Sequence, residues 1–139
     1  MNIMSLLRLK KDVAFIESAS TVRQAIEKFK YHGYAAVPVL DEEGRYKGTV
    51  TEGDLLRALV DEGSIKKLED HNILEIIRKD FNPSASVDID IKELLVMISN
   101  QNFVPIVDDR GVLMGIITRK SVISSMLNIF CGGTSLTVI

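Results

Sequence analysis

Four stretches of the chain place apolar residues at the spacing of an amphipathic helix: residues 19–34, 52–63, 90–101 and 119–130. In the first of them the apolar positions recur at i, i+3, i+4 and i+7, as Val22, Ala25, Ile26 and Phe29. Ser20 or Thr21 can cap the start of this helix, and Gly33 can end it. The pattern therefore predicts four helices, the third of them capped by Asp90.

Short apolar runs between these stretches predict strands instead. Residues 35–40 and 103–107 each precede a turn that contains an aspartate and a glycine, and residues 45–51 and 112–118 form the returning strands. Residues 86–89 are a further candidate strand. Pro38 has no amide donor, which favours an edge position or a strand end. Helix and strand thus alternate along both halves of the chain.

Two segments fall outside this alternation. Residues 64–80 are charged and carry one short apolar piece, which predicts a linker with a short helix that ends before Asn82-Pro83. Residues 130–139 show no periodicity and are expected to form a flexible tail.

The two halves repeat one another at a constant interval of 67 residues. Six of 23 residues are identical between positions 37–59 and 104–126, and they fall at turns and strand ends. The pairs that mark the repeat are Pro38/Pro105, Asp41/Asp108, Gly44/Gly111, Gly48/Gly115 and Thr51/Thr118. The repeat indicates an internal duplication, and its glycines are expected to serve turns and close packing rather than ligand contact.

Composition narrows the function classes. A net charge of −2 and a pI of about 5.7 argue against a general nucleic-acid binder. No run of about 18 apolar residues predicts a membrane span, and the start of the chain does not resemble a signal peptide. The single cysteine, Cys131, excludes an internal disulfide and leaves the redox compartment open. A reducing cytoplasm is the simpler expectation.

The repeated pattern of an apolar residue, proline, an Asp-x-x-Gly turn, glycine and threonine before a helix resembles the tandem cystathionine-β-synthase (CBS) domain pair. This resemblance implies an α+β fold of two pseudo-symmetric units, each strand-helix-strand-strand-helix, packed as one pair. The predicted borders are residues 8–63 for the first unit, 64–80 for the linker, 81–129 for the second unit and 130–139 for the tail. Stand-alone CBS pairs are typically sensors of adenosine-containing ligands such as AMP, ATP or cyclic di-AMP.

The resemblance also implies where a nucleotide would bind. In the family, a Thr-x-x-Asp segment at a helix start binds phosphate with threonine and helix amides, while the aspartate accepts the ribose hydroxyls. We call Thr51–Asp54 the first corner, because it matches this motif in full. We call Thr118–Ser121 the second corner; it has serine in place of aspartate, with Arg119 and Lys120 between.

The family's clefts place each corner opposite the first strands of the other unit. These strands form an apolar wall of the cleft. For the second corner the wall would consist of Val13, Ala14, Ala35 and Ala36. Because Arg119 and Lys120 add positive charge where a phosphate is expected, we predict that the second corner forms the main site.

Plainer interpretations exist for each of these residues. Thr51 and Thr118 can be simple helix caps, Asp54 can stabilise a helix start through the macrodipole, and Arg119 with Lys120 can be a solvated face. His32 and His71 have no partners at metal-ligand spacing, and no catalytic set is present. Neither a metal nor a cofactor is therefore expected.

The leading function is a non-enzymatic regulatory module whose nucleotide occupancy is sensed by a partner protein or across a dimer interface. The alternative is a structural or interaction module with empty clefts, and an enzyme is disfavoured. The many apolar positions of the four helices, above all residues 119–130, predict a homodimer joined through the helices.

Overall fold

The computed structural model describes residues 2–131, which divide into two compact units. The first-repeat unit comprises Ala14–Pro83, and the second-repeat unit combines the chain up to Val13 with the chain from Ser84 onward. The borders predicted from the sequence follow the repeat, whereas these units follow the contacts, so the N-terminal segment groups with the second repeat.

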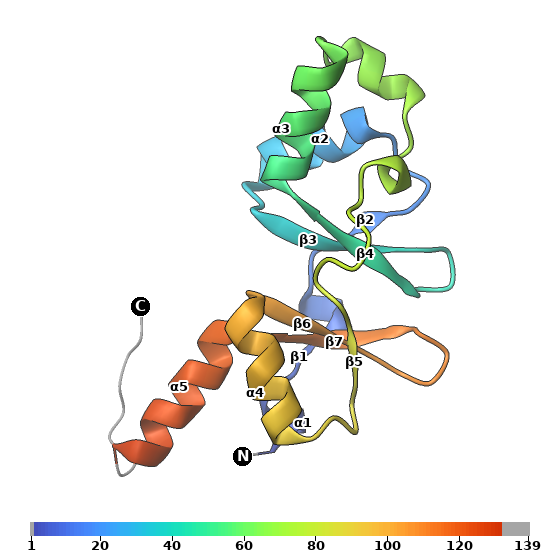
Figure 1. Ribbon diagram of the computed structural model, residues 1–139. Helices are drawn as coiled ribbons and strands as arrows, with labels where there is room; N and C mark the ends of the chain where they lie inside the picture. The colour runs from blue at the N-terminus through green and yellow to red at the C-terminus, as the bar shows by residue number, and fades with distance from the viewer. Residues whose placement is uncertain (1, 132–139) are drawn as a thin grey trace. The chain divides into compact units, whose positions relative to one another are not determined.

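The first-repeat unit is a three-stranded sheet with two helices (Figure 1). Its elements are β2 (Ile16–Glu17), α2 (Val22–His32), β3 (Ala36–Leu40), β4 (Tyr46–Thr51) and α3 (Glu52–Glu62). β3 lies in the centre, parallel to β2 and antiparallel to β4. Buried side chains from both helices and all three strands form its core, among them Ile16, Val22, Phe29, Val39, Val50 and Leu55.

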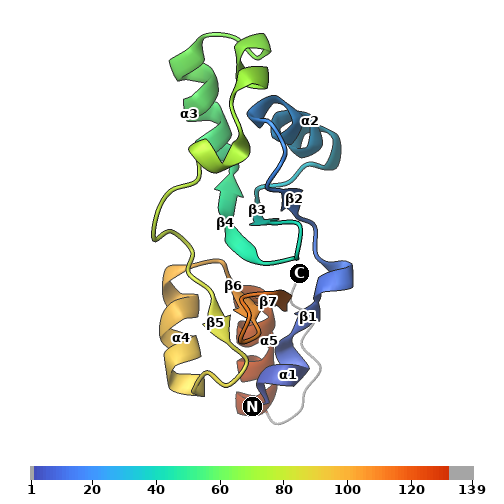
Figure 2. The same ribbon diagram turned by 90° about the vertical axis from the view of Figure 1, so that its right-hand side faces the viewer.

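The second-repeat unit has the same order of elements with an added N-terminal strand (Figure 2). The repeated elements are β5 (Ala85–Ser86), α4 (Ile91–Asn100), β6 (Phe103–Val107), β7 (Leu113–Thr118) and α5 (Arg119–Phe130). Helix α1 (Ile3–Leu6) contacts α5, while β1 (Arg8–Leu9) and the 3-10 helix η1 (Lys10–Asp12) follow it. The sheet order is β1-β7-β6-β5. The predicted α+β class and strand-helix-strand-strand-helix order are confirmed in both units.

Local signals set the helix ends as the sequence predicted. Thr21 caps α2 in a reciprocal capping box with Gln24, and Gly33 ends the helix in the left-handed conformation. Asp90 caps α4 by accepting the amide of Lys92. These bonds satisfy backbone groups that the helix itself leaves unpaired.

Pro38 is not on an edge strand, because β3 is the central strand of its sheet. The pairing of β3 with the short β2 nevertheless begins only at Val39, one residue after the proline. Pro105 lies in the same place, since β5 pairs with β6 from Ile106 onward. Each proline is paired with its antiparallel neighbour, Pro38 with Thr49 and Pro105 with Ile116. It has no amide to donate to the parallel neighbour, and the parallel pairing starts at the next residue.

The turn aspartates of the repeat organise the two hairpins. The Asp41 carboxylate accepts the amides of Glu43 and Arg45, and Asp108 accepts those of Arg110 and Val112. Desolvation acts to raise the pKa of both carboxyls, but the backbone hydrogen bonds and nearby arginines outweigh it and hold each pKa below the ordinary value of 3.8. The charged form is therefore the one that holds the turn.

Two repeat glycines permit close approach between chain segments, as predicted. An added Cβ at Gly48 would lie 2.5 Å from Cγ2 of Ile77, and one at Gly115 would overlap the carbonyl oxygen of Arg8. Gly115 thus allows β1 to lie against β7, where Leu9 pairs with Gly115.

Replacing Gly115 with alanine is expected to lower the free energy of unfolding by about 1–3 kcal/mol, since backbone must shift to admit the methyl group. Gly53→Ala is the control, because the atom nearest to its Cβ would be at the flexible end of Arg57, at 3.3 Å, and no backbone would have to shift. Urea denaturation measures both variants. Equal midpoints for Gly115→Ala and the unsubstituted protein would contradict the steric argument.

The middle segment is packed into the first-repeat unit rather than extended as a connector. It forms two 3-10 helices, η2 (Lys66–Asp70) and η3 (Ile73–Glu75), where the sequence predicted one short helix. Leu68 and Ile73 are fully buried in the core of that unit. Of the predicted tail, Phe130 ends α5 and Cys131 caps it, and residues 132–139 lie outside the described residues.

Candidate nucleotide-binding segments

The second corner lies at the junction of β7 and α5. Thr118 is the N-cap of α5, and its hydroxyl oxygen accepts the amide of Ser121 at 3.1 Å. The hydroxyls of the two residues lie 2.8 Å apart and share a further hydrogen bond. The amide of Arg119 donates to the carbonyl oxygen of Asn102 at 2.8 Å, which ties the helix start to the residue before β6.

The Arg119 side chain is held in place by the neighbouring helix. Its Nε donates to the carbonyl oxygen of Ile98, in the last turn of α4, at 2.9 Å. Lys120 is exposed. Both cations line a hollow of about 380 Å³ whose full lining is Asn102, Thr118, Arg119, Lys120 and Ile123. Three of the predicted site residues therefore gather around one hollow.

The charge at this helix start is unusual. The first turn of α5 contains two basic residues and no acidic residue, although a helix start favours negative charge. In residues 2–131 neither Arg119 nor Lys120 forms an ion pair. Helix amides and two cations together make the second corner a favourable place for an anion.

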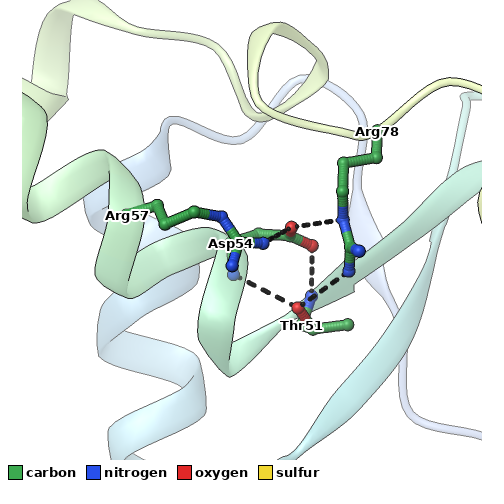
Figure 3. A network of polar contacts seen from close by, with 4 residues as sticks. All are labelled: Thr51, Asp54, Arg57 and Arg78. Atoms are coloured by element: carbon green, nitrogen blue, oxygen red, sulfur yellow. Dashed lines mark hydrogen bonds and ion pairs between the residues drawn. The ribbon is translucent and has the colours of Figure 1, made fainter.

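The first corner lies at the equivalent strand-to-helix junction, between β4 and α3, but the first turn of its helix carries acidic residues instead of basic ones. Thr51 caps α3 by accepting the amide of Asp54 at 3.2 Å, and Asp54 Oδ2 accepts the amide of Thr51 at 2.9 Å. Asp54 Oδ1 also accepts Arg57 Nη2 at 2.7 Å and Arg78 Nε at 2.8 Å (Figure 3). Both oxygens of the carboxylate are therefore engaged within the protein.

Asp54 is more than a solvated acid at a helix start, because its side chain is only 1% exposed. The two arginines that bind Asp54 were not among the site residues predicted from the sequence. Arg57 follows Asp54 at the i, i+3 spacing of a helical ion pair, which was a usable signal. Arg78 lies 24 residues away in sequence and carried no local signal.

The predicted apolar wall is divided between the two units. Val13 is buried at the end of the N-terminal segment, whereas Ala14, Ala35 and Ala36 belong to the first-repeat unit. Within that unit Ala36 pairs with Thr51, and the carbonyl of Ala35 accepts the amide of Glu52. The contribution of these residues to ligand binding stays a prediction, as do the ligand roles of Thr51, Asp54, Thr118, Arg119, Lys120 and Ser121.

The described residues contain neither a metal-binding cluster nor a membrane-spanning helix. No group of three or more histidine, cysteine, aspartate or glutamate side chains in residues 2–131 could hold a metal ion. Over the same range, none of the helices combines the length and the apolar character that crossing a bilayer demands.

Comparison with known proteins places the chain in a family. The CBS domain matches the sequence twice, over residues 5–61 and 70–128. The chain belongs to the CBS domain family. The two matches together cover most of the sequence, and the two tandem CBS domains correspond to the two halves of the repeat.

The relatives of the chain include a receptor and an enzyme. Cyclic di-AMP receptor B of Bacillus subtilis is 25% identical over 116 residues, which cover 82% of this chain and 78% of the receptor. Inosine-5′-monophosphate dehydrogenase of Methanocaldococcus jannaschii is 30% identical over 115 residues, but these are only 21% of the enzyme. The CBS chain thus matches most of a receptor and a small part of an enzyme.

A solved structure confirms the CBS pair fold. The CbpB protein of Listeria monocytogenes, crystallised in complex with cyclic di-AMP, aligns with a TM-score of 0.84 at 21% identity. The alignment covers 95% of this chain and 98% of the Listeria protein.

Proposed function

We propose that this protein is a non-catalytic regulatory module that binds an adenosine-containing nucleotide through the second corner. The observation that carries the proposal is the hollow at the start of α5, which Thr118, Arg119 and Lys120 line together. A guanidinium and the first amides of a helix are both strong donors to phosphate oxygens. Without an acidic residue in its first turn, this helix start favours an anionic ligand.

Cyclic di-AMP is the nucleotide that we expect to bind most tightly. AMP and ATP carry a ribose with two free hydroxyls, whereas each ribose of a 3′,5′-linked cyclic dinucleotide has one, because the other is esterified. Loss of the aspartate that accepts both hydroxyls therefore costs a cyclic dinucleotide less, and the second corner has Ser121 at that position. The two phosphates also match two cations, and the names of the receptor and of the Listeria complex support the same ligand.

The module would act through a protein partner that distinguishes its occupied and empty states, because a ligand shifts a population only through differential affinity.

A homodimer joined through helices is part of the proposal. Large apolar side chains are exposed on α3, where Leu56 is 62% and Val60 is 70% exposed, and at the end of α5, where Phe130 is 79% exposed. Light scattering that returned a monomer at micromolar concentration would contradict the dimer. The composition, with its one cysteine, supports a cytoplasmic location.

A thermal-shift panel with cyclic di-AMP, AMP, ADP, ATP and S-adenosylmethionine tests the function. A ligand at 100 times its dissociation constant should stabilise the protein by about 2.7 kcal/mol, and we expect the largest shift with cyclic di-AMP. Chromatography should recover the nucleotide unchanged, since the proposal includes no catalysis. Absence of a shift with every ligand would instead support a structural or interaction module.

A further inference from the structure

The first corner is occupied by the protein's own cations. Oδ1 of Asp54 accepts a hydrogen bond from Arg57 and another from Arg78, and its Oδ2 is used by the backbone of Thr51 (Figure 3). A ribose diol needs the same carboxylate oxygens. Three hydrogen bonds already use most of the acceptor capacity of the carboxylate, so both hydroxyls of a diol could bind Asp54 only if one of these donors left. A neutral diol does not replace the charge of an arginine that it displaces.

Arg78 and Arg57 differ in how they reach this carboxylate. Arg57 lies one turn along α3 from Asp54, with its side chain 61% exposed. Arg78 comes from the segment after η3, and its Nη2 also reaches the hydroxyl oxygen of Thr51 at 3.5 Å. Its guanidinium lies 3.7 Å from the centre of the Phe81 ring. Arg78 thus donates to the side chains of both Thr51 and Asp54, whereas Arg57 donates to that of Asp54.

The segment that carries Arg78 is fastened along strand β4. On one side of Arg78, Ile77 packs against Gly48. On the other, Nδ2 of the buried Asn82 donates to the Thr49 hydroxyl at 3.0 Å, and the Asn82 carbonyl accepts the Tyr46 hydroxyl at 2.7 Å. We call residues 77–82 the strap. Because both ends of the strap contact β4, the Arg78 side chain lies beside Thr51, the last residue of that strand.

We propose that Arg78 keeps the first corner closed, so that it competes directly with a nucleoside diol for Asp54. This inference rests on the proposed function, since it assigns the state of the family's second potential nucleotide site. The two corners then differ in kind: the first has its carboxylate paired with two arginines, and the second has two cations that form no ion pair within residues 2–131. The chain consequently binds nucleotide at the second corner and excludes it from the first.

The test is calorimetric titration of AMP, which has a free diol, into Arg78→Met. Methionine keeps an apolar stem beside Phe81 and removes the guanidinium. Removal of a charge-assisted competitor should tighten AMP binding by about tenfold or more, or add a second equivalent per chain. Arg57→Met is the matched control, because it removes the other guanidinium from the same oxygen and leaves the strap in place; a smaller gain is expected. Adding Asp54→Asn to Arg78→Met should abolish the gain.

AMP affinity and stoichiometry of Arg78→Met that both equal those of the unsubstituted protein would overturn the proposal. A lower affinity would also overturn it, because it would show that Arg78 contacts the ligand. If Arg78→Met does not melt cooperatively, Arg78→Gln takes its place with the same expected direction. Failure of the proposed function is separate, because it is judged by cyclic di-AMP binding to the unsubstituted protein. A gain of AMP binding without cyclic di-AMP binding would support the closed corner and contradict the proposed ligand.

Discussion

Replacing Arg119 with alanine is expected to weaken cyclic di-AMP binding by about 1.5–3 kcal/mol, the range for a hydrogen bond to a charged group. This corresponds to a loss of roughly ten- to a hundredfold or slightly more in affinity. The hydrogen bond of Arg119 Nε to the Ile98 carbonyl holds the guanidinium at the start of α5, so its outer nitrogens need little ordering to meet a phosphate. Titration calorimetry at two salt concentrations measures the effect.

The salt dependence provides a second readout for the same variant. An exposed ion pair is screened by salt, so affinity should fall less steeply with salt in Arg119→Ala than in the unsubstituted protein. Arg110→Ala is the control, because Arg110 is an exposed arginine of the same unit that pairs with Asp108 in the hairpin turn. Equal affinity of Arg119→Ala and the unsubstituted protein at both salt concentrations would identify the basic pair as a solvated helix start.

Asp54→Ala is expected to lower the free energy of unfolding by about 2–3 kcal/mol. Breaking a buried ion pair costs about 3–5 kcal/mol, but Arg57 and Arg78 are roughly half exposed and can be solvated after the change, which reduces the loss. The substitution also removes one bond of the capping box of α3. For a chain of this size the melting temperature should fall by about 6–12 °C.

Glu52→Ala is the matched control for Asp54, since Glu52 also lies in the first turn of α3 but is exposed. A surface acid at a helix start contributes about 0.3–1 kcal/mol, so the two variants should separate clearly in thermal or urea denaturation. Similar losses for Asp54→Ala and Glu52→Ala would mean that the two arginine contacts add nothing measurable to stability.

The composition of the second corner could be predicted from the sequence in part. "TEGD" and "TRKS" occupy equivalent positions of the repeat, and the structure places Thr118, Arg119 and Lys120 around one hollow. That grouping was predictable because the three residues are consecutive at a strand-to-helix junction. The bond of Arg119 to Ile98 was not, since it joins residues 21 positions apart.

The repeated elements and their ends follow from local signals in the sequence. Thr21, Gly33, Asp90 and Thr118 act within three or four residues of their own positions, and hydrophobic periodicity acts within one helix or strand. Such signals are legible without any knowledge of distant contacts.

The contacts between distant segments could not be predicted in this way, because they arise only when the chain folds. The pairing of Arg8 with Ile116, the burial of Leu68 and Ile73, and the contact of Arg78 with Asp54 join residues that no local rule connects. In particular, a first-turn aspartate on a helix is solvated unless another part of the chain covers it, and here the strap does. Whether the charges of each corner are paired therefore depends on packing, because burial and ion pairing are properties of the folded chain and not of the motif.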